Sequence, residues 1–204
     1  MRVQHTLLVV VFSLILASCA APINQRNAEK YYAVAVSAQH SGDWWNSRMY
    51  FARAISNAEL AGSSSESLAV LWYEYGRSSG VICDWEEAEI GLNKAHELDS
   101  KTGGPTYMSL YELARMNYDR EMYPEAVEYY QRTYSDMEVD QADTKDPIGY
   151  AEFLDEYGHA LKQIGRDDLV PQLSARSIKI RAAFKGKDSH TEKTPYGTEC
   201  QTNS

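Results

Sequence analysis

The hydrophobic and polar positions divide the chain into three parts. A short apolar run, Leu7 to Leu16, lies near the N-terminus after the basic residue Arg2. Between residues 28 and 184 a frame of large and small residues recurs, and no segment alternates with period two for long enough to be a strand. Beyond Phe184 the chain is rich in Gly, Lys, Thr and Ser. This pattern predicts an all-α domain over residues 28–184 and an irregular tail over residues 185–204.

The recurring frame is plainest in the second of four copies. There Trp72-x-x-Tyr75-Gly76 is followed, at the spacing of a second helix, by Trp85-x-x-Ala88-x-x-x-Leu92. When Trp72 is taken as the fourth position of the frame, the same position in the other copies is filled by Tyr31, Leu110 and Leu154. The second helix of the last copy fits poorly, because Ser174 falls where a large residue is expected.

Local signals mark the ends of the helices. Ser63-x-x-Glu66 and Asp84-x-x-Glu87 have the form of capping boxes that open helices. Gly103-Gly104-Pro105 and Asp146-Pro147 each end one repeat and open the next, with proline near the first helical position. These boundaries fall between copies of the frame, so the two kinds of pattern agree.

The frame resembles the tetratricopeptide repeat, W-x₂-L-G-x₂-Y…A-x₃-F, in which small residues let two antiparallel helices approach. The resemblance implies a short right-handed solenoid of about four helix pairs, with the first helix of each pair lining a concave face. Successive copies are longer than the standard repeat of ~34 residues, and the extra residues fall between repeats. The divergent fourth copy is expected to act as a terminal cap.

The N-terminus has the order of a secretory signal peptide, and the apolar run is too short to span a membrane. Leu16-Ala17-Ser18-Cys19 then resembles the bacterial lipobox. The resemblance implies a signal peptide over residues 1–18, acylation (palmitate) on Cys19, and a lipidated linker over residues 19–27. Because Ala20 rather than Asp follows the cysteine, it also implies an outer-membrane anchor facing the periplasm. An ordinary signal peptide with an incidental cysteine is the alternative.

Composition and motif spacing exclude several function classes. The formal net charge of −9 argues against nucleic-acid binding. None of the four histidines after residue 19 has a metal-ligand spacing, the cysteines form no C-x-x-C pair, and no glycine-rich phosphate loop is present. We therefore expect no enzymatic activity, catalytic residue, cofactor, metal site or small-molecule substrate.

Surface recognition remains, and the frame indicates where it would occur. By the resemblance, the concave face carries the candidate protein-binding residues Tyr32, Tyr73, Arg77, Tyr111, Arg115, Tyr118, His159 and Lys162. Tyrosine and arginine are enriched at binding hot spots. The alternative is structural: Glu74, Glu112 and Glu156 each precede a basic frame position by three residues and could form ion pairs within the helix. The tyrosines could likewise pack between repeats.

Two cysteines remain after Cys19. Cys83 falls in the turn between the two helices of the second repeat, where Gly42 and Gly165 stand in other copies. Cys200 lies in the polar tail, which is long enough to fold back along the array. Because the expected compartment is oxidising, a Cys83–Cys200 disulfide is the favoured prediction. The alternative is a buried, inert Cys83 with Cys200 free or paired to another molecule.

These expectations lead to one favoured function. The chain is expected to be an outer-membrane-anchored periplasmic lipoprotein that acts as a protein–protein interaction scaffold in envelope, pilus or secretion assembly. Its partners would be envelope proteins whose identity the sequence does not specify, together with the membrane that holds its lipid anchor. An adaptor that recruits peptidoglycan hydrolases and a self-associating structural lipoprotein are the alternatives.

Overall fold

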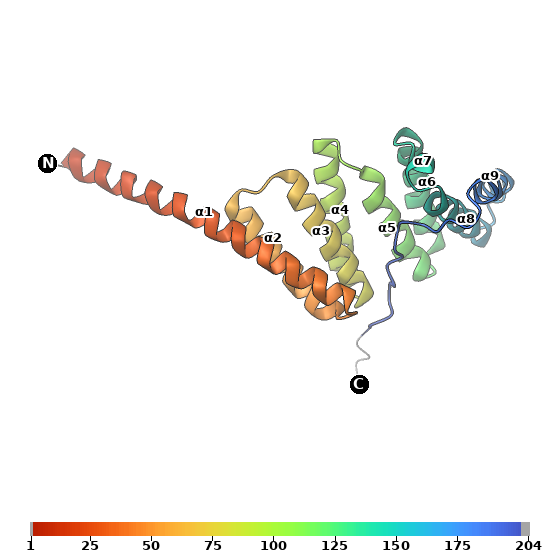
Figure 1. Cartoon of the computed structure of the whole chain (residues 1–204), viewed down its shortest axis with the longest axis horizontal. Helices are drawn as coiled ribbons and strands as arrows, with labels where there is room; N and C mark the ends of the chain where they lie inside the picture. The colour runs from red at the N-terminus through yellow and green to blue at the C-terminus, as the bar shows by residue number, and fades with distance from the viewer. Residues whose placement is uncertain (1, 201–204) are drawn as a thin grey trace.

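A computed structural model describes the backbone of residues 2–200 and the side chains of residues 20–200. The described residues form nine helices and no strand (Figure 1). The helices are α1 (Arg2–His40), α2 (Trp44–Ala61), α3 (Ser65–Val81), α4 (Trp85–Thr102), α5 (Thr106–Asp119), α6 (Tyr123–Val139), α7 (Ala142–Lys145), α8 (Pro147–Gln163) and α9 (Val170–Ala183). The all-α prediction is confirmed.

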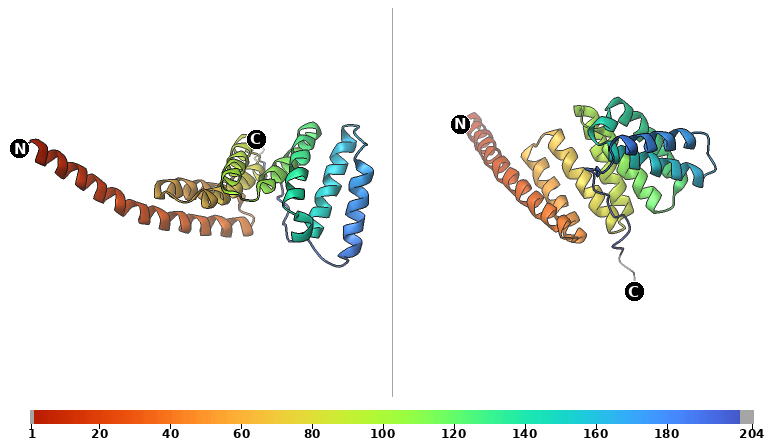
Figure 2. Two further views of the ribbon diagram at one scale, coloured as in Figure 1. Left: turned by 90° about the horizontal axis from the view of Figure 1, so that it is seen from above. Right: turned by 45° about the vertical axis from the view of Figure 1, so that its right-hand side comes forward.

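Eight of these helices form four antiparallel pairs, α1–α2, α3–α4, α5–α6 and α8–α9. Each pair packs against the next, so that the pairs stack along the molecule (Figure 2). The single-turn helix α7 is inserted between the third and fourth pairs, where the repeat is longest. This is the tetratricopeptide-like solenoid that the repeat frame predicted.

The turn inside each pair has the same backbone conformation. One residue of each turn has a positive φ angle: Gly42 (78°), Cys83 (67°), Glu121 (58°) and Gly165 (71°). All four lie at the same distance after the fourth position of the frame, so the frame has the correct register in every copy. Glycine adopts this left-handed conformation without steric cost, whereas Cys83 and Glu121 adopt it less readily.

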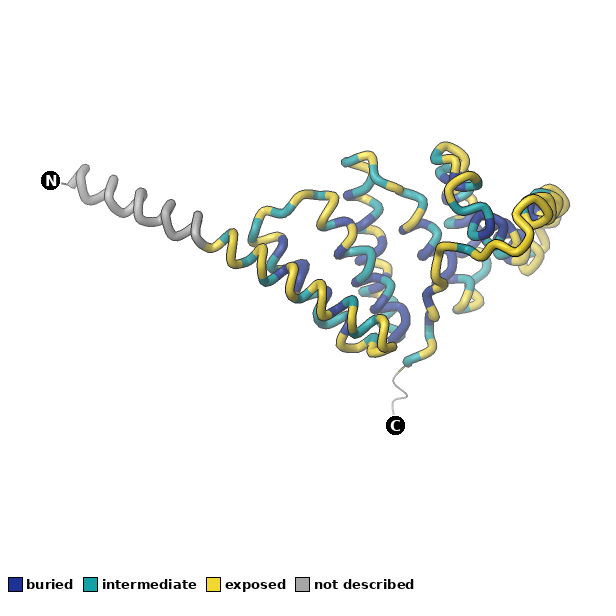
Figure 3. Tube along the Cα trace, viewed as in Figure 1, coloured by how far each residue is buried: buried dark blue, intermediate teal, exposed yellow. Residues whose placement is uncertain are grey.

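The core follows the frame as well. The large residues Phe51, Leu92 and Tyr130 are completely buried, and so are the small residues that oppose them at the helix crossings. Ser174, at the corresponding place in α9, is exposed, and α9 buries only Leu173 and Ser177. The outer side of α9 is consequently exposed along its length (Figure 3). The fourth repeat therefore ends the array as a cap.

The predicted helix boundaries need two corrections. The cap of α3 is Ser64 rather than Ser63, and its hydroxyl accepts a hydrogen bond from the Ser67 amide at 3.3 Å. Asp84 does precede α4, but its carboxylate makes no capping bond and instead accepts a hydrogen bond from Arg48 of α2 at 2.6 Å. The Asp146-Pro147 boundary is confirmed, since Asp146 caps α8 by accepting from the Gly149 amide at 2.9 Å.

The predicted leader and lipid attachment site lie outside the part of the chain with described side chains, which begins at residue 20. Cys19 and the boundary of the leader over residues 1–18 therefore stay predictions. Residues 20–27 of the expected linker over residues 19–27 are described and belong to α1. No helix in the described part of the chain combines the length and apolar character needed to cross a membrane.

Candidate functional site

The C-terminal segment lies against the solenoid rather than away from it. We call the surface formed by α3, α5 and α8, the first helices of repeats two to four, the inner face. After α9 the chain turns back and residues 189–200, here the tail segment, run across this face from α8 past α5 to the end of α3 (Figure 1). The tail is irregular, as predicted, and it has a defined position on the inner face.

The first residues of the tail segment are bound by Asp146, the cap of α8. One carboxylate oxygen accepts hydrogen bonds from the Ser189 hydroxyl at 2.9 Å, the Thr191 hydroxyl at 3.0 Å and the His190 amide at 3.1 Å. Partial burial alone would raise the pKa of Asp146, but these bonds and the one from Gly149 hold it below the ordinary value of 3.8. The same carboxylate therefore caps a helix and fixes the start of the tail segment.

Thr194 and Lys193 bind the middle of the inner face. Lys193 forms an ion pair with Glu156 of α8 at 2.6 Å. The Thr194 hydroxyl accepts a hydrogen bond from Arg77 of α3 at 2.8 Å, and its carbonyl oxygen accepts one from Arg115 of α5 at 3.4 Å. Thr194 is only 1% exposed. Two arginines from successive repeats therefore converge on a single residue of the tail segment.

Tyr196 inserts its side chain into the inner face and is 5% exposed. Its hydroxyl donates to the buried carboxylate of Glu112 at 2.7 Å, and its ring packs against a core cluster that contains Leu113 and Met116. Burial and the negative charge of Glu112 raise the pKa of the Tyr196 hydroxyl well above 10.0. The hydroxyl is therefore a hydrogen-bond donor at neutral pH.

The ring of Tyr196 fits because α3 carries a glycine beneath it. A Cβ atom on Gly80 would lie 2.5 Å from the ring carbon Cε1 of Tyr196 and 2.6 Å from Cδ1, closer than real contacts allow. The neighbouring backbone continues the contact, since the Gly197 amide donates to the Gly80 carbonyl at 3.2 Å and the Glu199 amide to the Val81 carbonyl at 3.1 Å. The end of α3 thus accepts the tail through both shape and backbone hydrogen bonds.

A disulfide between Cys83 and Cys200 ends the tail segment, with the two Cα atoms 5.0 Å apart. Cys83 stands at the positive-φ position of the turn between α3 and α4, which presents its side chain beside the end of α3. The two residues are separated by 117 positions in the sequence. The tail is thus tied covalently to the second repeat.

The structure places the eight candidate binding residues in two groups. Four of them, Tyr73, Arg77, Tyr111 and Arg115, lie together at the centre of the inner face, where none is exposed. The sequence predicts that these four side chains form an exposed stripe, but the tail segment covers them. The alternative prediction, ion pairs within each helix, also holds for two of these residues. Arg77 lies 3.0 Å from Glu74, and Arg115 lies 3.7 Å from Glu112.

The other four candidates lie toward the ends of the array. Tyr118 of α5 shares a 2.6 Å hydrogen bond with the exposed His159 of α8, and Lys162 lies beside His159 in a shallow hollow. Tyr32 of α1 is 40% exposed. It borders a hollow of ≈ 540 Å³ that reaches to Lys193 and Pro195 of the tail. Tyr32, His159 and Lys162 are exposed, whereas Tyr118 is partly buried like the tyrosines of the central group.

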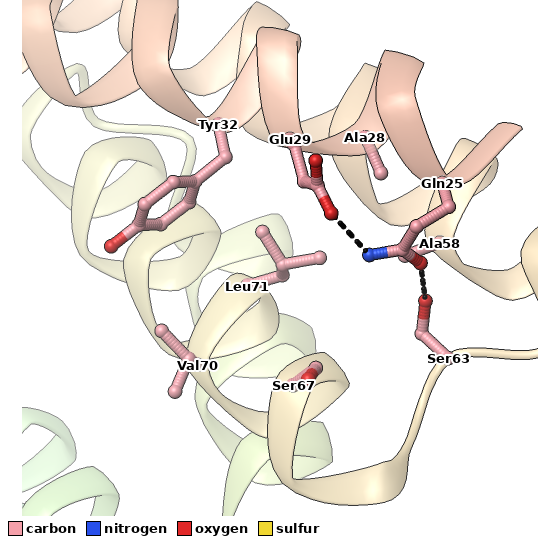
Figure 4. Close-up of a pocket in the computed structure, with 9 residues that line it drawn as sticks. All are labelled: Gln25, Ala28, Glu29, Tyr32, Ala58, Ser63, Ser67, Val70 and Leu71. Carbon is pink, nitrogen blue, oxygen red and sulfur yellow. Dashed lines mark hydrogen bonds between the residues drawn. The ribbon is translucent and has the colours of Figure 1, made fainter. Parts of the chain in front are cut away.

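Tyr32 also borders an apolar pocket of ≈ 300 Å³ between α1 and α3 (Figure 4). Val70 and Leu71 form its apolar wall on α3. Opposite them, the Gln25 amide donates to Glu29 at 2.9 Å and accepts from the Ser63 hydroxyl at 2.9 Å.

In the part of the chain with described side chains, no three His, Cys, Asp or Glu residues gather in a way that could hold a metal ion.

The sequence singles out Arg77, Arg115 and Cys83, but it does not show that Glu112, Asp146 and Gly80 also hold the tail. Glu112 was considered only as a partner for Arg115, and Asp146 only as a helix boundary. Gly80 offers one signal, since a glycine inside a helix is unfavourable by about 1 kcal/mol without a packing role. No local pattern connects it with Thr194 and Tyr196, which follow more than a hundred residues later.

No protein-family model and no curated protein matches the sequence. Among solved structures, the chain is similar to BtubC (BKLC) from P. vanneervenii, with a TM-score of 0.71 and 16% identity over 81% of this chain and 67% of that one. It is also similar to a putative kinesin light chain from Podosopora anserina with nearly identical TPR-like repeats, with a TM-score of 0.60 and 17% identity over 91% of this chain and 97% of that one. Sequence identities this low show a shared fold alone. This chain therefore has a tetratricopeptide-like fold, and its own C-terminal segment covers the inner face.

Proposed function

We propose that this protein is a lipid-anchored scaffold that binds other envelope proteins from the periplasmic side of the outer membrane. The observation that carries the proposal is the irregular tail segment on the inner face, where Thr194 and Tyr196 are buried among side chains of α3 and α5. A surface that binds one irregular segment through the hydroxyls and backbone of that segment is suited to bind another. The tetratricopeptide-like fold supports the same kind of activity.

The anchor is proposed from Leu16-Ala17-Ser18-Cys19. Several acyl chains on Cys19 would hold the protein firmly, because each buried CH₂ contributes ~0.8 kcal/mol. Replacing Cys19 with Ala is expected to abolish incorporation of labelled palmitate and to release the protein from the outer-membrane fraction. Continued labelling of the Cys19→Ala variant would contradict the anchor without bearing on the inner face.

The partner is proposed to be a component of envelope, pilus or secretion assembly, and crosslinking in intact cells tests this. A photo-reactive residue at Tyr32 samples both open hollows, and the same residue at Ile178, on the outer side of α9 and 66% exposed, is the matched control. Capture of an assembly component from position 32 but not from 178 supports the proposal. Capture of peptidoglycan hydrolases, or of this chain alone, would replace it with an adaptor or a self-associating protein.

A further inference from the structure

The centre of the inner face is built around charges that need the tail. Glu112 is 2% exposed and Arg115 is 5% exposed. Glu112 accepts from Tyr196 at 2.7 Å, while Arg77 donates to Thr194 at 2.8 Å. If the tail left, Glu112 would lose the Tyr196 hydroxyl and Arg77 would lose the Thr194 hydroxyl, and water would have to take their places. The face therefore favours an occupant that replaces both hydroxyls.

The chemistry of that occupant can be specified from the tail itself. A hydroxyl must meet Arg77, the carbonyl of the same residue must meet Arg115, and a phenol must reach Glu112 two residues later. The backbone then turns at Gly197, where φ is 70°, and its amides bind the Gly80 and Val81 carbonyls. The gap that Gly80 leaves admits a flat ring. This defines a binding site for a peptide of the form Ser/Thr-x-Tyr-Gly that turns after the tyrosine, at a glycine with positive φ.

The tail resembles a tethered ligand more than a part of the core. Residues 185–188 and 190–193 are exposed, and Thr194 and Tyr196 are the only buried residues between Phe184 and Cys200. A short flexible tether gives its ligand an effective concentration of about millimolar. The disulfide adds a second tether at the opposite end, so an oxidised tail segment cannot leave the face.

We propose that the tail segment is an internal ligand, that the inner face also binds a Ser/Thr-x-Tyr-Gly peptide of a partner protein, and that reduction of Cys83–Cys200 is required for the exchange. The thiolate of a dithiol reductant attacks Sγ of the exposed Cys200, the S–S bond breaks, and Cys83 leaves as a thiolate. The second thiol of the reductant resolves the mixed disulfide. Two electrons and two protons pass from the dithiol to the two cysteines.

Peptide binding to the purified full chain tests this inference, which rests on the proposed scaffold function. The probe is a fluorescein-labelled peptide with the sequence of residues 189–199, and its matched control carries Tyr196→Phe. Fluorescence anisotropy is measured with the oxidised wild type, the wild type in excess dithiothreitol, and a Cys200→Ser, Tyr196→Ala variant whose own tail is weakened.

We expect no binding to the oxidised wild type, weak binding to the reduced wild type, and binding at least ten-fold tighter to the double variant. The Tyr196→Phe peptide should bind the double variant about ten-fold more weakly, because it lacks the hydrogen bond to a carboxylate. Equal affinity for both peptides, or equal binding to the oxidised wild type and the double variant, would overturn the inference.

Hydrogen exchange in the wild type provides a second measurement that needs no variant. Reduction should accelerate exchange at the Gly197 and Glu199 amides, which bind the end of α3, and should leave the amides in the middle of α8 unchanged. Unchanged protection of Gly197 and Glu199 after reduction would also overturn the inference. If these tests fail while Tyr32 still captures an assembly component, the scaffold proposal stands and only the exchange is rejected.

Discussion

At the residue scale, Gly76 and Gly158 occupy the same position of the repeat frame in different surroundings. A Cβ atom on Gly76 would lie 2.8 Å from the Leu92 amide nitrogen and 3.0 Å from the Ala88 carbonyl oxygen, both in the backbone of α4. On Gly158 the nearest atom would be Cδ1 of Leu173, at 4.0 Å. The helices of the second repeat therefore approach more closely than those of the fourth.

Substituting alanine at these two positions should have opposite effects. Gly76→Ala is expected to lower the free energy of unfolding by about 1–3 kcal/mol, because α3 and α4 must move apart. Gly158→Ala should raise it by up to about 1 kcal/mol, because alanine favours a helix over glycine. Urea unfolding of the two variants measures both effects, and a similar change in both would show that the frame misplaces the crossing.

Asp146 provides a prediction about pH at the same scale. Its pKa is below 3.8 in the folded chain, so its contribution to stability is complete above pH 3.8 and is lost as pH falls through the lowered value. An NMR titration of the Asp146 carboxyl carbon should give this lowered pKa. Ser189→Ala removes one donor and should move the pKa upward, whereas an unchanged pKa would mean that the tail does not bind Asp146 in solution.

At the element scale, α3 combines two contacts that a substitution can separate. Gly76 faces α4, and Gly80, one helical turn later, faces the ring of Tyr196. Both glycines lie within a helix whose other residues fit the frame. At Gly80 an added Cβ would lie 3.5 Å from the Cβ of Ala88 in α4, which is an ordinary contact, so the tail can be displaced there without separating the helix pair.

Gly80→Ala should loosen the tail segment while α3 stays helical. The new Cβ would occupy the place of the Tyr196 ring, so the ring must withdraw from Glu112. We expect faster hydrogen exchange at the Gly197 and Glu199 amides, with circular dichroism unchanged at 222 nm, where helices absorb. Exchange at the Ser79 and Val81 amides, which flank this site, reports on α3 itself and should stay unchanged. Unchanged exchange of the two tail amides would contradict the tight fit.

The elements themselves were largely predictable from the sequence. The frame placed the helix pairs and the turn residues correctly, because side chains such as Phe51 and Leu92 pack within or next to their own repeat. The position of the tail was not predictable in the same way. Its contacts join residues such as Arg77 and Thr194 across 117 positions, and its composition is that of a solvated segment. Within the tail, Cys200 is the residue that predicts its return to the array.

At the scale of the whole molecule, the disulfide joins the tail to the second repeat across 117 positions. On the chain-entropy model a crosslink over such a loop stabilises the folded state by about 5 kcal/mol, because it restricts the unfolded chain. Replacing both Cys83 and Cys200 with Ser should lower the free energy of urea unfolding by about that amount. Non-reducing mass spectrometry of the exported wild type is the control, since two free thiols would remove the basis of the prediction.

The tail segment also changes the topology of the repeat array. In an ordinary solenoid each repeat contacts only its neighbours, so the terminal repeats can unfold while the rest stays folded. Here the chain that leaves α9 returns to Arg115, Arg77 and Cys83. The tail therefore joins the fourth repeat to the third and the second, and the chain forms a closed circuit through all three. Fraying of the fourth repeat must break contacts with the second, which couples the two in a single cooperative unit. The long-range closure raises the contact order of a fold that is otherwise local, so the closed circuit should form last, after the helix pairs have assembled.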